Sequence, residues 1–397
     1  MKNEVTVTLK NKVIKKFKSG YPLVQKSFVE STHMLKHEGT IMNLVDNNGD
    51  FIGKGYYGSQ NKGIGWVLSQ RPEEEIDHSF FEKRIKKAIH GRNGFYKDTD
   101  TTAFRVFNGE GDGIGGFTID YFAGYYLINF YSEGIYSFRS LILESLQKLV
   151  EYTAIYEKKR FGKQGQYIEE DEFVAGERGD FPVIVKENGV NFAVYLNEGA
   201  MVGVFLDQRE VRKKIRDEYA EGQSVLNMFS YTGAFSVFAA LGGASHTTSV
   251  DLANRSYAKT IENFSLNGID FEAHDIVVED VFQYFKYAKR KNKLFDLIVL
   301  DPPSFARSKK TLFKAEKDYT NLLKETIAIT EKRGTIVAST NCSTFNMKKF
   351  KSFVDTAFKE MNVKFRIEWE YSLPQDYKTL PEYAEGNYLK VLFIRLL

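Results

Sequence analysis

The feature that most constrains the fold is a short apolar run that breaks at a polar turn and continues into a helical pattern. Residues 224–228 have the length and composition of a buried strand, and Ser-Tyr-Thr-Gly at 230–233 is typical of a tight turn. Residues rich in Ala, Phe and Val follow with helical spacing. A strand, a turn and a helix in this order open the sheet of nucleotide-binding α/β proteins. Asp251 follows the next β-type segment, where an acid can accept hydrogen bonds from both hydroxyls of a ribose.

The composition of this turn favours one class of nucleotide over another. A dinucleotide site needs several glycines so that the backbone can approach a pyrophosphate, whereas Ser230, Tyr231 and Thr232 carry side chains there. S-adenosylmethionine contains adenosine but no pyrophosphate, so it tolerates a turn that is poor in glycine. We therefore expect S-adenosylmethionine as the cofactor, with S-adenosylhomocysteine as the product, in preference to NAD.

From about residue 186 to the end, strands alternate with helices. We expect further strands at 275–278, 294–300, 334–339, 365–372 and 388–396, and helices at 210–218, 253–266, 281–289 and 317–330. This pattern predicts a mostly parallel sheet that binds its ligands at the carboxyl ends of the strands. Asp251, Asp280, Asp301 and Cys342 each closely follow a β-type segment, so we expect them to line one crevice. Asp280 is placed to bind the amino group of adenine, and it is equally suited to cap the helix that begins at Val281.

Residues 1 to about 75 read as a small module of strands, at 5–9, 39–45, 52–57 and 64–68, with turn signals between them. The segment after the first strand is crowded with lysines, namely Lys10, Lys12, Lys15, Lys16 and Lys18. A mostly β module with a basic edge would suit the phosphates of RNA. A lysine-rich face that meets only solvent is an equally good interpretation.

Residues from about 76 to 185 have a mixed pattern, with helices expected at 80–89 and 135–150, strands at 104–107 and 154–161, and a hairpin at 117–131. Gly111 to Gly116 matches the dinucleotide-binding pattern G-x-G-x-x-G. The segment after it reads as a strand and not as a helix, so we predict a turn without a nucleotide. The acidic run at 169–172 is expected to be a solvated loop.

Composition excludes several classes of protein. The 397 residues allow two or three domains, and 55 basic and 52 acidic side chains give a net charge of only +3, which neither requires nor excludes a polyanionic partner. A single cysteine rules out an intrachain disulfide and indicates a reducing compartment. The first 21 residues lack the apolar block of a signal peptide, and no stretch is long and apolar enough for a bilayer. We expect a cytoplasmic protein with no membrane association and no metal site, since His33 and His37 lack a third ligand nearby.

Asp301, Pro302 and Pro303 form the sharpest chemical signal, because an apolar strand leads directly into them. The two prolines fix an extended turn without backbone donors, which can hold an acid and bare carbonyl groups toward a planar base. Three basic residues follow the turn, Arg307, Lys309 and Lys310. They could make the site electropositive or bind RNA phosphates, and they could equally form an ordinary solvated loop.

Cys342 would explain a specific reaction, although a lone cysteine is more often a small buried hydrophobe. It lies just past a strand end, between Asn341 and Ser343. Carbon 5 of cytosine is too weakly nucleophilic to accept a methyl group unaided. A thiolate that adds to carbon 6 makes carbon 5 enamine-like, and Asp301 would hydrogen-bond the N3/N4 edge of the base. The residues therefore predict Cys342 and Asp301 as the catalytic pair of a cytosine-5 methyltransferase.

With these motifs in hand, the chain resembles the bacterial class I methyltransferases that carry an N-terminal PUA domain and act on large-subunit (23S) ribosomal RNA, in particular the cytosine-5 enzymes. The resemblance covers nearly the whole chain. It is carried by the motifs at 18–22, 108–113, 205–209, 227–233, 301–305, 341–343 and 385–390.

The resemblance implies an α/β fold with a Rossmann-like class I methyltransferase sheet. It implies a PUA-like RNA-binding domain at 1–75, a small α/β substrate-binding domain at 76–185 and the catalytic domain at 186–397. It implies large-subunit rRNA as the substrate and Cys342 as the nucleophile. The cofactor contacts that it implies are Phe205, Gln208, Arg209, Asn227, Phe229, Ser230, Tyr231, Thr232, Gly233, Asp251, Leu252, Asp280, Val281 and Asp301.

Two other functions stay open at this point. The first is methylation of guanine N7 or an exocyclic amine, with Asp301 positioning the base and Cys342 only packing. The second is a non-catalytic RNA-binding or ribosome-assembly protein. The target nucleotide, the base that removes the carbon-5 proton and the oligomeric state, a homodimer included, are not given by the sequence.

Overall fold

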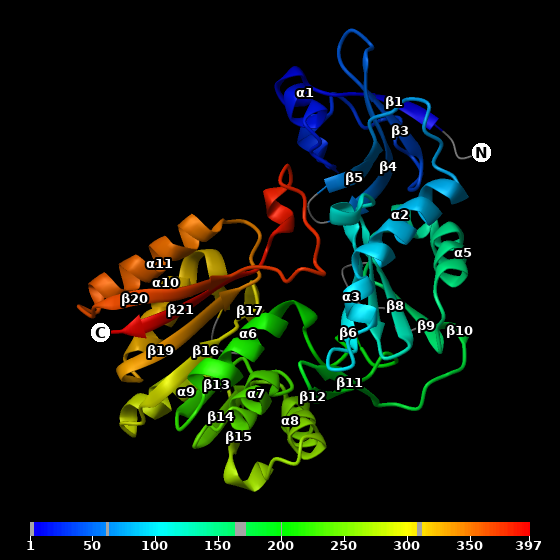
Figure 1. Cartoon of the computed structure of the whole chain (residues 1–397). Helices are drawn as coiled ribbons and strands as arrows, with labels where there is room; N and C mark the ends of the chain where they lie inside the picture. The colour runs from blue at the N-terminus through cyan, green and yellow to red at the C-terminus, as the bar shows by residue number, and fades with distance from the viewer. Residues whose placement is uncertain (1–3, 61–62, 163–171, 200, 308–311) are drawn as a thin grey trace. The chain divides into compact units, whose positions relative to one another are not determined.

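The computed structural model of the chain describes residues 4–60, 63–162, 172–199, 201–307 and 312–397, and these residues form two compact units (Figure 1). The first unit comprises Met1–Val185, Val194–Val202 and Gln375–Gly386, and the second comprises Lys186–Ala193, Gly203–Pro374 and Asn387–Leu397. Each unit therefore contains segments that are far apart in the sequence. The domains expected at 1–75, 76–185 and 186–397 stay a prediction, because a domain is defined by independent folding as well as by compactness.

A five-stranded sheet with the strand order β1-β3-β4-β5-β2 begins the first unit. Its strands are β1 (Glu4–Thr8), β2 (Leu23–Val24), β3 (Ile41–Val45), β4 (Phe51–Gln60) and β5 (Gly63–Ser69). The lysine-rich segment after β1 forms helix α1 (Asn11–Lys18), which the sequence did not predict. Val13 and Phe17 are the buried residues of α1, and their spacing of four places both on one helical face. Four of the five lysines therefore extend from a helix, and Lys10 is its N-cap residue.

A second sheet in the same unit has the order β10-β9-β8-β7-β6. Its strands are β6 (Ala103–Asn108), β7 (Phe117–Phe122), β8 (Tyr125–Phe130), β9 (Ala154–Lys159) and β10 (Phe173–Gly176), and its helices are α2 (His78–Gly91), α3 (Asn93–Tyr96), α4 (Glu133–Tyr136) and α5 (Arg139–Leu149). The single helix expected at 135–150 is thus two helices, which are separated by Ser137, the C-cap of α4, and Phe138, the N-cap of α5. One continuous hydrophobic core joins both sheets of the unit.

The glycine-rich stretch at 111–116 is a turn that leads into β7, as predicted from its context. Gly113 and Gly116 have φ angles of 95° and 101°, which favour glycine. A Cβ atom on Gly111 would lie 1.8 Å from the carbonyl oxygen of Lys378. These glycines therefore serve close backbone packing and not a nucleotide.

The second unit contains a seven-stranded sheet with the order β15-β14-β13-β16-β19-β21-β20. The strands are β13 (Ser224–Met228), β14 (His246–Asp251), β15 (Asp275–Val278), β16 (Phe295–Leu300), β19 (Thr330–Thr340), β20 (Phe365–Tyr371) and β21 (Lys390–Leu396). The first five strands in chain order pair in parallel, and β21 pairs antiparallel with both β19 and β20. This is the mostly parallel, Rossmann-like sheet that the sequence predicts.

Helices cover both faces of this sheet (Figure 1). Alternate strand residues, such as Val299 and Val391, pack with α6 (Arg209–Lys214) and α7 (Ala234–Leu241). The residues between them, such as Ile298 and Leu392, pack with α9 (Val281–Arg290), α10 (Ala315–Ile327) and α11 (Met347–Glu360). The second unit also contains helix α8 (Asn254–Leu266). Two small sheets have two strands each. One consists of β17 (Phe305–Arg307) and β18 (Leu312–Lys314), and the other consists of β11 (Val183–Glu187) and β12 (Val190–Val194).

A buried ion pair fixes α6 within the second unit. The Arg212 guanidinium donates to both carboxylate oxygens of Glu187 at 2.6 and 2.7 Å, and both side chains are buried. The same guanidinium donates to the carbonyl oxygen of Phe205 at 2.6 Å. It thereby ties the Phe205 segment to α6.

We expect Glu187→Ala to lower the free energy of unfolding by roughly 3–5 kcal/mol, because it leaves the Arg212 guanidinium buried without its partner. Urea unfolding monitored by circular dichroism measures this loss. The double variant Glu187→Leu/Arg212→Met is the matched control, and it should lose much less because no charge is left unpaired. A loss below about 1 kcal/mol for the single variant would show that the pair is not structurally important.

Candidate active site

The carboxyl ends of the parallel strands bring the predicted site residues to one edge of the seven-stranded sheet. From β13 the chain runs outward through β14 to β15, and it then returns to β16 on the other side of β13. A ligand crevice forms at such a reversal point in open α/β sheets. Asp251 ends β14, Asp301 directly follows β16, and Cys342 lies two residues beyond β19.

The turn after β13 has an unusual backbone. Phe229 and Tyr231 have φ angles of 61° and 52°, in the left-handed region that non-glycine residues rarely adopt, and Gly233 follows with 74°. Such residues cost of order 1–3 kcal/mol each and cluster at ligand sites. A Cβ atom on Gly233 would lie 2.5 Å from the Thr260 side chain, so this position requires glycine.

Asp251 holds this turn in place. One of its carboxylate oxygens accepts a hydrogen bond from the Tyr231 N–H at 2.8 Å, and the other accepts one from the Ala253 N–H at 2.9 Å. The Ser230 N–H donates to the carbonyl oxygen of Val250 at 3.0 Å. These bonds offset part of the backbone strain and join the ends of β13 and β14. The adjacent Leu252 is 54% exposed.

The segment before α6 lies over the same edge. The rings of Phe205 and Tyr231 are 5.3 Å apart, and Phe205 is 42% exposed. The hydroxyl of Thr232 donates to the carbonyl oxygen of Gly203 at 2.7 Å. Arg209 is buried, with Nε 3.3 Å from a Glu210 carboxylate oxygen, and its predicted contact with the cofactor stays a prediction.

Asp280 caps helix α9, which is one of the two roles that the sequence allows for it. Its carboxylate accepts a hydrogen bond from the Phe282 N–H at 2.9 Å, which caps α9. The N–H of Glu279 donates to the carbonyl oxygen of Asp251 at 3.0 Å, so the start of α9 is joined to the end of β14. Val281 is buried at the first position of the helix. A carboxylate that caps a helix can still accept another hydrogen bond, so the cap does not exclude a ligand contact.

Asp301 stands at the centre of a buried polar network. Gln208 Nε2 donates to Asp301 Oδ1 at 2.8 Å and to Ser339 Oγ at 2.7 Å, and Ser339 Oγ donates to the same Oδ1 at 2.9 Å. Both bonds converge on Oδ1, whereas a carboxyl group has a second oxygen with hydrogen-bonding capacity of its own. Burial raises the pKa of Asp301 to about 6 against the opposing hydrogen bond from Ser339, and the negative charge of Asp207 adds to the rise.

Cys342 is 6% exposed and lies at the edge of the core formed with α10 and α11. Its sulfur is 3.2 Å from the Thr344 hydroxyl, and its N–H donates to the Thr340 hydroxyl at 3.2 Å. The Ser304 hydroxyl donates to the Asn341 side-chain oxygen at 2.6 Å. The Asp-Pro-Pro turn and the cysteine turn are therefore directly bonded. Burial by itself also fits a cysteine that only packs.

Three residues of this arrangement have no role in the sequence-based prediction. Ser339 bonds Asp301, and the Tyr319 hydroxyl donates to the Ser339 carbonyl oxygen at 2.6 Å. The buried ammonium of Lys390, at the start of β21, donates to the carbonyl oxygen of Cys342 at 2.8 Å. A polar pair at the end of an apolar strand could have signalled Ser339. Lys390 was recognised only as part of the 385–390 motif.

The basic residues predicted to bind RNA are divided between the two units. Lys12, Lys15 and Lys16 are exposed on α1, Lys10 precedes that helix, and the Lys16 ammonium lies 3.4 Å from the centre of the Tyr21 ring. In the second unit, Arg307 ends β17, and Lys309 and Lys310 lie outside the described residues.

The described part of the chain has neither a membrane-spanning helix nor a cluster of metal ligands. No helix there is long and apolar enough to cross a membrane. No group of three or more His, Cys, Asp or Glu side chains is arranged to hold a metal ion in those residues.

Comparison with known proteins identifies related chains over nearly the full length. Residues 105–374 match the family model of S-adenosylmethionine-dependent methyltransferases, and residues 7–70 match that of a PUA-like domain. The chain is 58% identical over 391 residues to YwbD of Bacillus subtilis (strain 168), which is provisionally named as a ribosomal RNA large subunit methyltransferase, and the match covers 98% of this chain and 99% of that one. It is 29% identical over 377 residues, covering 94% and 95% of the two chains, to ribosomal RNA large subunit methyltransferase I of Aeromonas salmonicida (strain A449).

Solved structures share the whole architecture. The crystal structure of SMU.776, described provisionally as a methyltransferase and complexed with SAH, superposes with a TM-score of 0.90 and 36% sequence identity. The match covers 99% of this chain and 100% of that one. A second chain, from Streptococcus mutans, gives a TM-score of 0.90 at 34% identity and covers 98% and 100% of the two chains.

Asp301→Asn provides a test of the buried carboxyl group. Its pKa of about 6 in the folded chain lies above the ordinary value of 3.8, so the folded state binds this proton more tightly than the unfolded state. The resulting stabilisation is complete below about pH 4 and is lost as the pH rises through about 6. The stability of the variant relative to the natural chain should therefore rise by about 1–3 kcal/mol between pH 4 and pH 7. Urea unfolding of both proteins at pH 4 and pH 7 measures this change. If the difference in unfolding free energy between the two proteins is the same at both pH values, the raised pKa is contradicted.

Proposed function

The chain belongs to the S-adenosylmethionine-dependent methyltransferase family, and from this premise we propose that it forms 5-methylcytosine in large-subunit ribosomal RNA through a covalent bond between Cys342 and carbon 6 of the target base. Transfer of a methyl group from S-adenosylmethionine is the activity of the family. Large-subunit ribosomal RNA as substrate is supported by the names of full-length relatives, two of which are YwbD and the Aeromonas enzyme. The choice of cytosine carbon 5 rests on one observation, namely that Cys342 and Asp301 lie on turns that are directly bonded to each other.

The residues at the sheet edge fit the cofactor. The Oε1 atom of Gln208 and the Oδ1 atom of Asn227 are buried and have no hydrogen-bond partner among the described residues, so each can accept a bond from a ligand. The Asp251 carboxylate keeps acceptor capacity after its two backbone bonds. We propose that Asp251 holds the ribose, that Asp280 binds near the adenine, and that the strained turn at 229–233 passes close to the amino-acid part.

Residues Phe205 and Leu252 offer apolar surface to the same ligand, because both are large and exposed at the edge. The buried residues Arg209 and Val281 are the first residues of α6 and α9, and we propose that they contribute by packing these helices next to the site. When bound, the cofactor supplies a methyl group on a positively charged sulfur, which carbon 5 of the activated base takes. We propose that residues of the chain carry out the other steps, which are the activation of the base and the binding of its edge.

Cys342 is proposed to start the reaction. Its thiolate adds to carbon 6 of the cytosine, and the electron pair that is released makes carbon 5 nucleophilic. Gln208 and Ser339 both bond Oδ1 of Asp301, so we propose that the second oxygen of this carboxyl group bonds the N3/N4 edge and stabilises the charge that develops there. After methylation, a base removes the proton from carbon 5 and the carbon–sulfur bond breaks, which restores the thiolate.

Burial of Cys342 places a condition on this mechanism. A sulfur in a side chain that is only 6% exposed must be uncovered before carbon 6 can reach it. We propose that RNA binding displaces the turn at 343–346, whose Thr344 hydroxyl contacts the sulfur. The ammonium of Lys390 keeps the Cys342 carbonyl oxygen fixed in our proposal, so that the backbone stays in place while the turn moves.

Methylation of guanine N7 or of an exocyclic amine is the competing function. It needs Asp301 and the adjacent turn but not the sulfur, and the burial of Cys342 favours it over the cytosine reaction. Nucleoside mass spectrometry of rRNA treated with the enzyme distinguishes the products.

We expect Cys342→Ala to abolish 5-methylcytosine formation, with a loss of at least about 10³-fold in turnover, because the covalent step is removed. Cofactor affinity, measured by calorimetry, should stay unchanged. The activity is measured by incorporation of labelled methyl groups into large-subunit rRNA. Thr344→Ala is the matched control, since it changes the contact to the sulfur and keeps the nucleophile. Full turnover of Cys342→Ala would refute the covalent mechanism, and 7-methylguanosine as the product would establish the competing function.

A further inference from the structure

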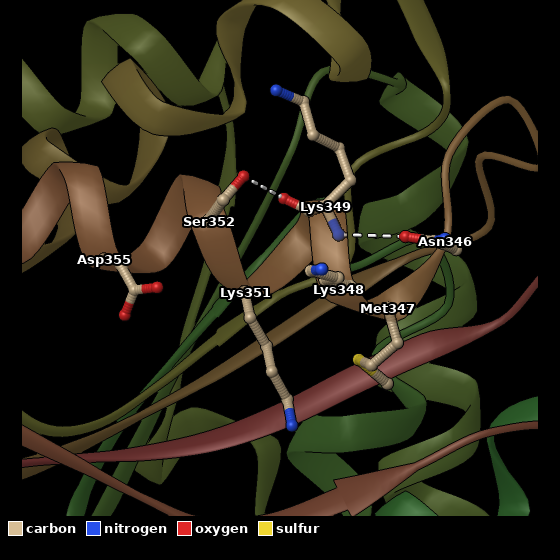
Figure 2. A pocket seen from close by; sticks show the side chains of 7 residues that line it. All are labelled: Asn346, Met347, Lys348, Lys349, Lys351, Ser352 and Asp355. Atoms are coloured by element: carbon tan, nitrogen blue, oxygen red, sulfur yellow. Dashed lines mark hydrogen bonds between the residues drawn. The ribbon is translucent and has the colours of Figure 1, made fainter.

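We propose that the first two turns of α11 bind the phosphate backbone of the substrate RNA next to the target nucleotide. The inference deepens the proposed function and rests on it, because it assigns part of the RNA-binding surface. The surface, called here the α11 lysine surface, consists of Lys348, Lys349 and Lys351 around a hollow of about 660 Å³ (Figure 2). The residues that line the hollow are Asn346, Met347, Lys348, Lys349, Lys351, Ser352 and Asp355.

Local hydrogen bonds keep this part of the helix well formed. The Asn346 side chain accepts a bond from the Lys349 N–H at 3.0 Å and thereby caps α11, and the Ser352 hydroxyl donates to the Lys349 carbonyl oxygen at 2.7 Å (Figure 2). The buried face of α11 includes Phe350 and Phe353. The lysines therefore extend from a rigid support, and no ordering of the backbone is needed before they bind.

The positive charges at the amino end of α11 lower the stability of this helix when no anion is bound. The amino end of a helix favours acidic residues by about 0.3–1 kcal/mol each, yet the first turn of α11 contains no acid and two lysines. Lys351 is paired with Glu370 at 2.5 Å. Lys348 is exposed and has no ion pair among the described residues, and the Lys349 ammonium lies 5.1 Å from the centre of the Phe353 ring. An external anion would compensate this positive charge.

The arrangement of the amines fits an extended polyanion better than one small anion. In the view of Figure 2, Lys349 and Lys351 extend to opposite sides of the helix, and Lys348 lies between them. The amines therefore do not converge on one point. A nucleic-acid strand presents a row of phosphates, about 3.4 Å apart along its axis, that could meet separate lysines.

The α11 lysine surface is close to the proposed active site along the chain. Only residues 343–346 separate Cys342 from Met347, the first residue of α11. Six residues span at most about 20 Å, so the backbone of Lys348 lies no farther than this from that of Cys342. This distance corresponds to about six nucleotides along a strand. The turn that must move to uncover the sulfur is also the connection to this helix. Binding of phosphates to α11 would therefore act directly on that turn.

Salt-dependent binding of a large-subunit rRNA transcript to the full chain tests the inference. The variant is Lys348→Gln/Lys349→Gln, and the matched control is Lys359→Gln, which removes an exposed lysine from the last turn of the same helix. We expect the double variant to raise Kd about tenfold at 0.15 M salt. It should also reduce the slope of log Kobs against log salt by about 1.4–1.8, which corresponds to two lost phosphate contacts. The control should bind as the natural chain does, and calorimetry should give the same S-adenosylmethionine affinity for all three proteins.

The outcomes separate this inference from the proposed function. If the natural chain methylates rRNA and the double variant keeps its Kd and salt slope, the α11 lysine surface does not bind RNA, and the proposed function stands. If Lys359→Gln weakens binding as much as the double variant, the effect is one of net charge and the inference is wrong. If the natural chain neither binds nor methylates rRNA, the proposed function itself fails.

Discussion

The parallel pairing of β13 with β16 is the interaction on which the rest of the structure depends. Met228 lies opposite Leu300 in this pair, so the turn at 229–233 and Asp301 leave the sheet at the same level. The chain order reverses between these two strands, and open α/β sheets bind their ligands at such a reversal point. A shift of the register by one residue would exchange the buried faces of β16 and would turn Asp301 away from its partners. Cofactor and substrate residues thus depend on one register.

Three polar side chains are buried as one hydrogen-bonded group, although burial of each without a partner would lower the stability of the fold. Asp301, Gln208 and Ser339 come from three separate segments and satisfy each other at 2.7–2.9 Å. A buried network of this kind is destabilising when it is only partly satisfied, and it fixes one arrangement when it is complete. Gln208 Oε1 is the atom of this network that is buried without a hydrogen-bond partner among the described residues, and we propose that the ligand supplies one. Binding of that ligand would therefore complete the network.

The sequence predicted the sheet of the second unit, and it placed the candidate site residues after its strands, because strong local signals mark them. The apolar runs of β13, β16 and β19 are each followed by a residue with distinctive chemistry. The sequence did not predict α1. This segment is rich in lysine, and its buried residues are two, Val13 and Phe17, which is too few for a clear helical pattern. The sequence did not identify Lys390 or Ser339 either, because their partners lie 48 and 38 residues away in the chain, and one sequence gives no pairing at that distance. The roles of the predicted site residues remain to be tested.

The most direct test of the covalent mechanism is intact-mass analysis of the protein after reaction with rRNA that contains 5-fluorocytidine in place of cytidine. Fluorine at carbon 5 cannot leave as a proton does, so the bond between the sulfur and carbon 6 should persist after methylation. The account predicts a stable protein–RNA adduct that forms only with S-adenosylmethionine present and is absent from Cys342→Ala. Complete methylation of the natural RNA, together with no adduct on the fluorinated RNA, would contradict it.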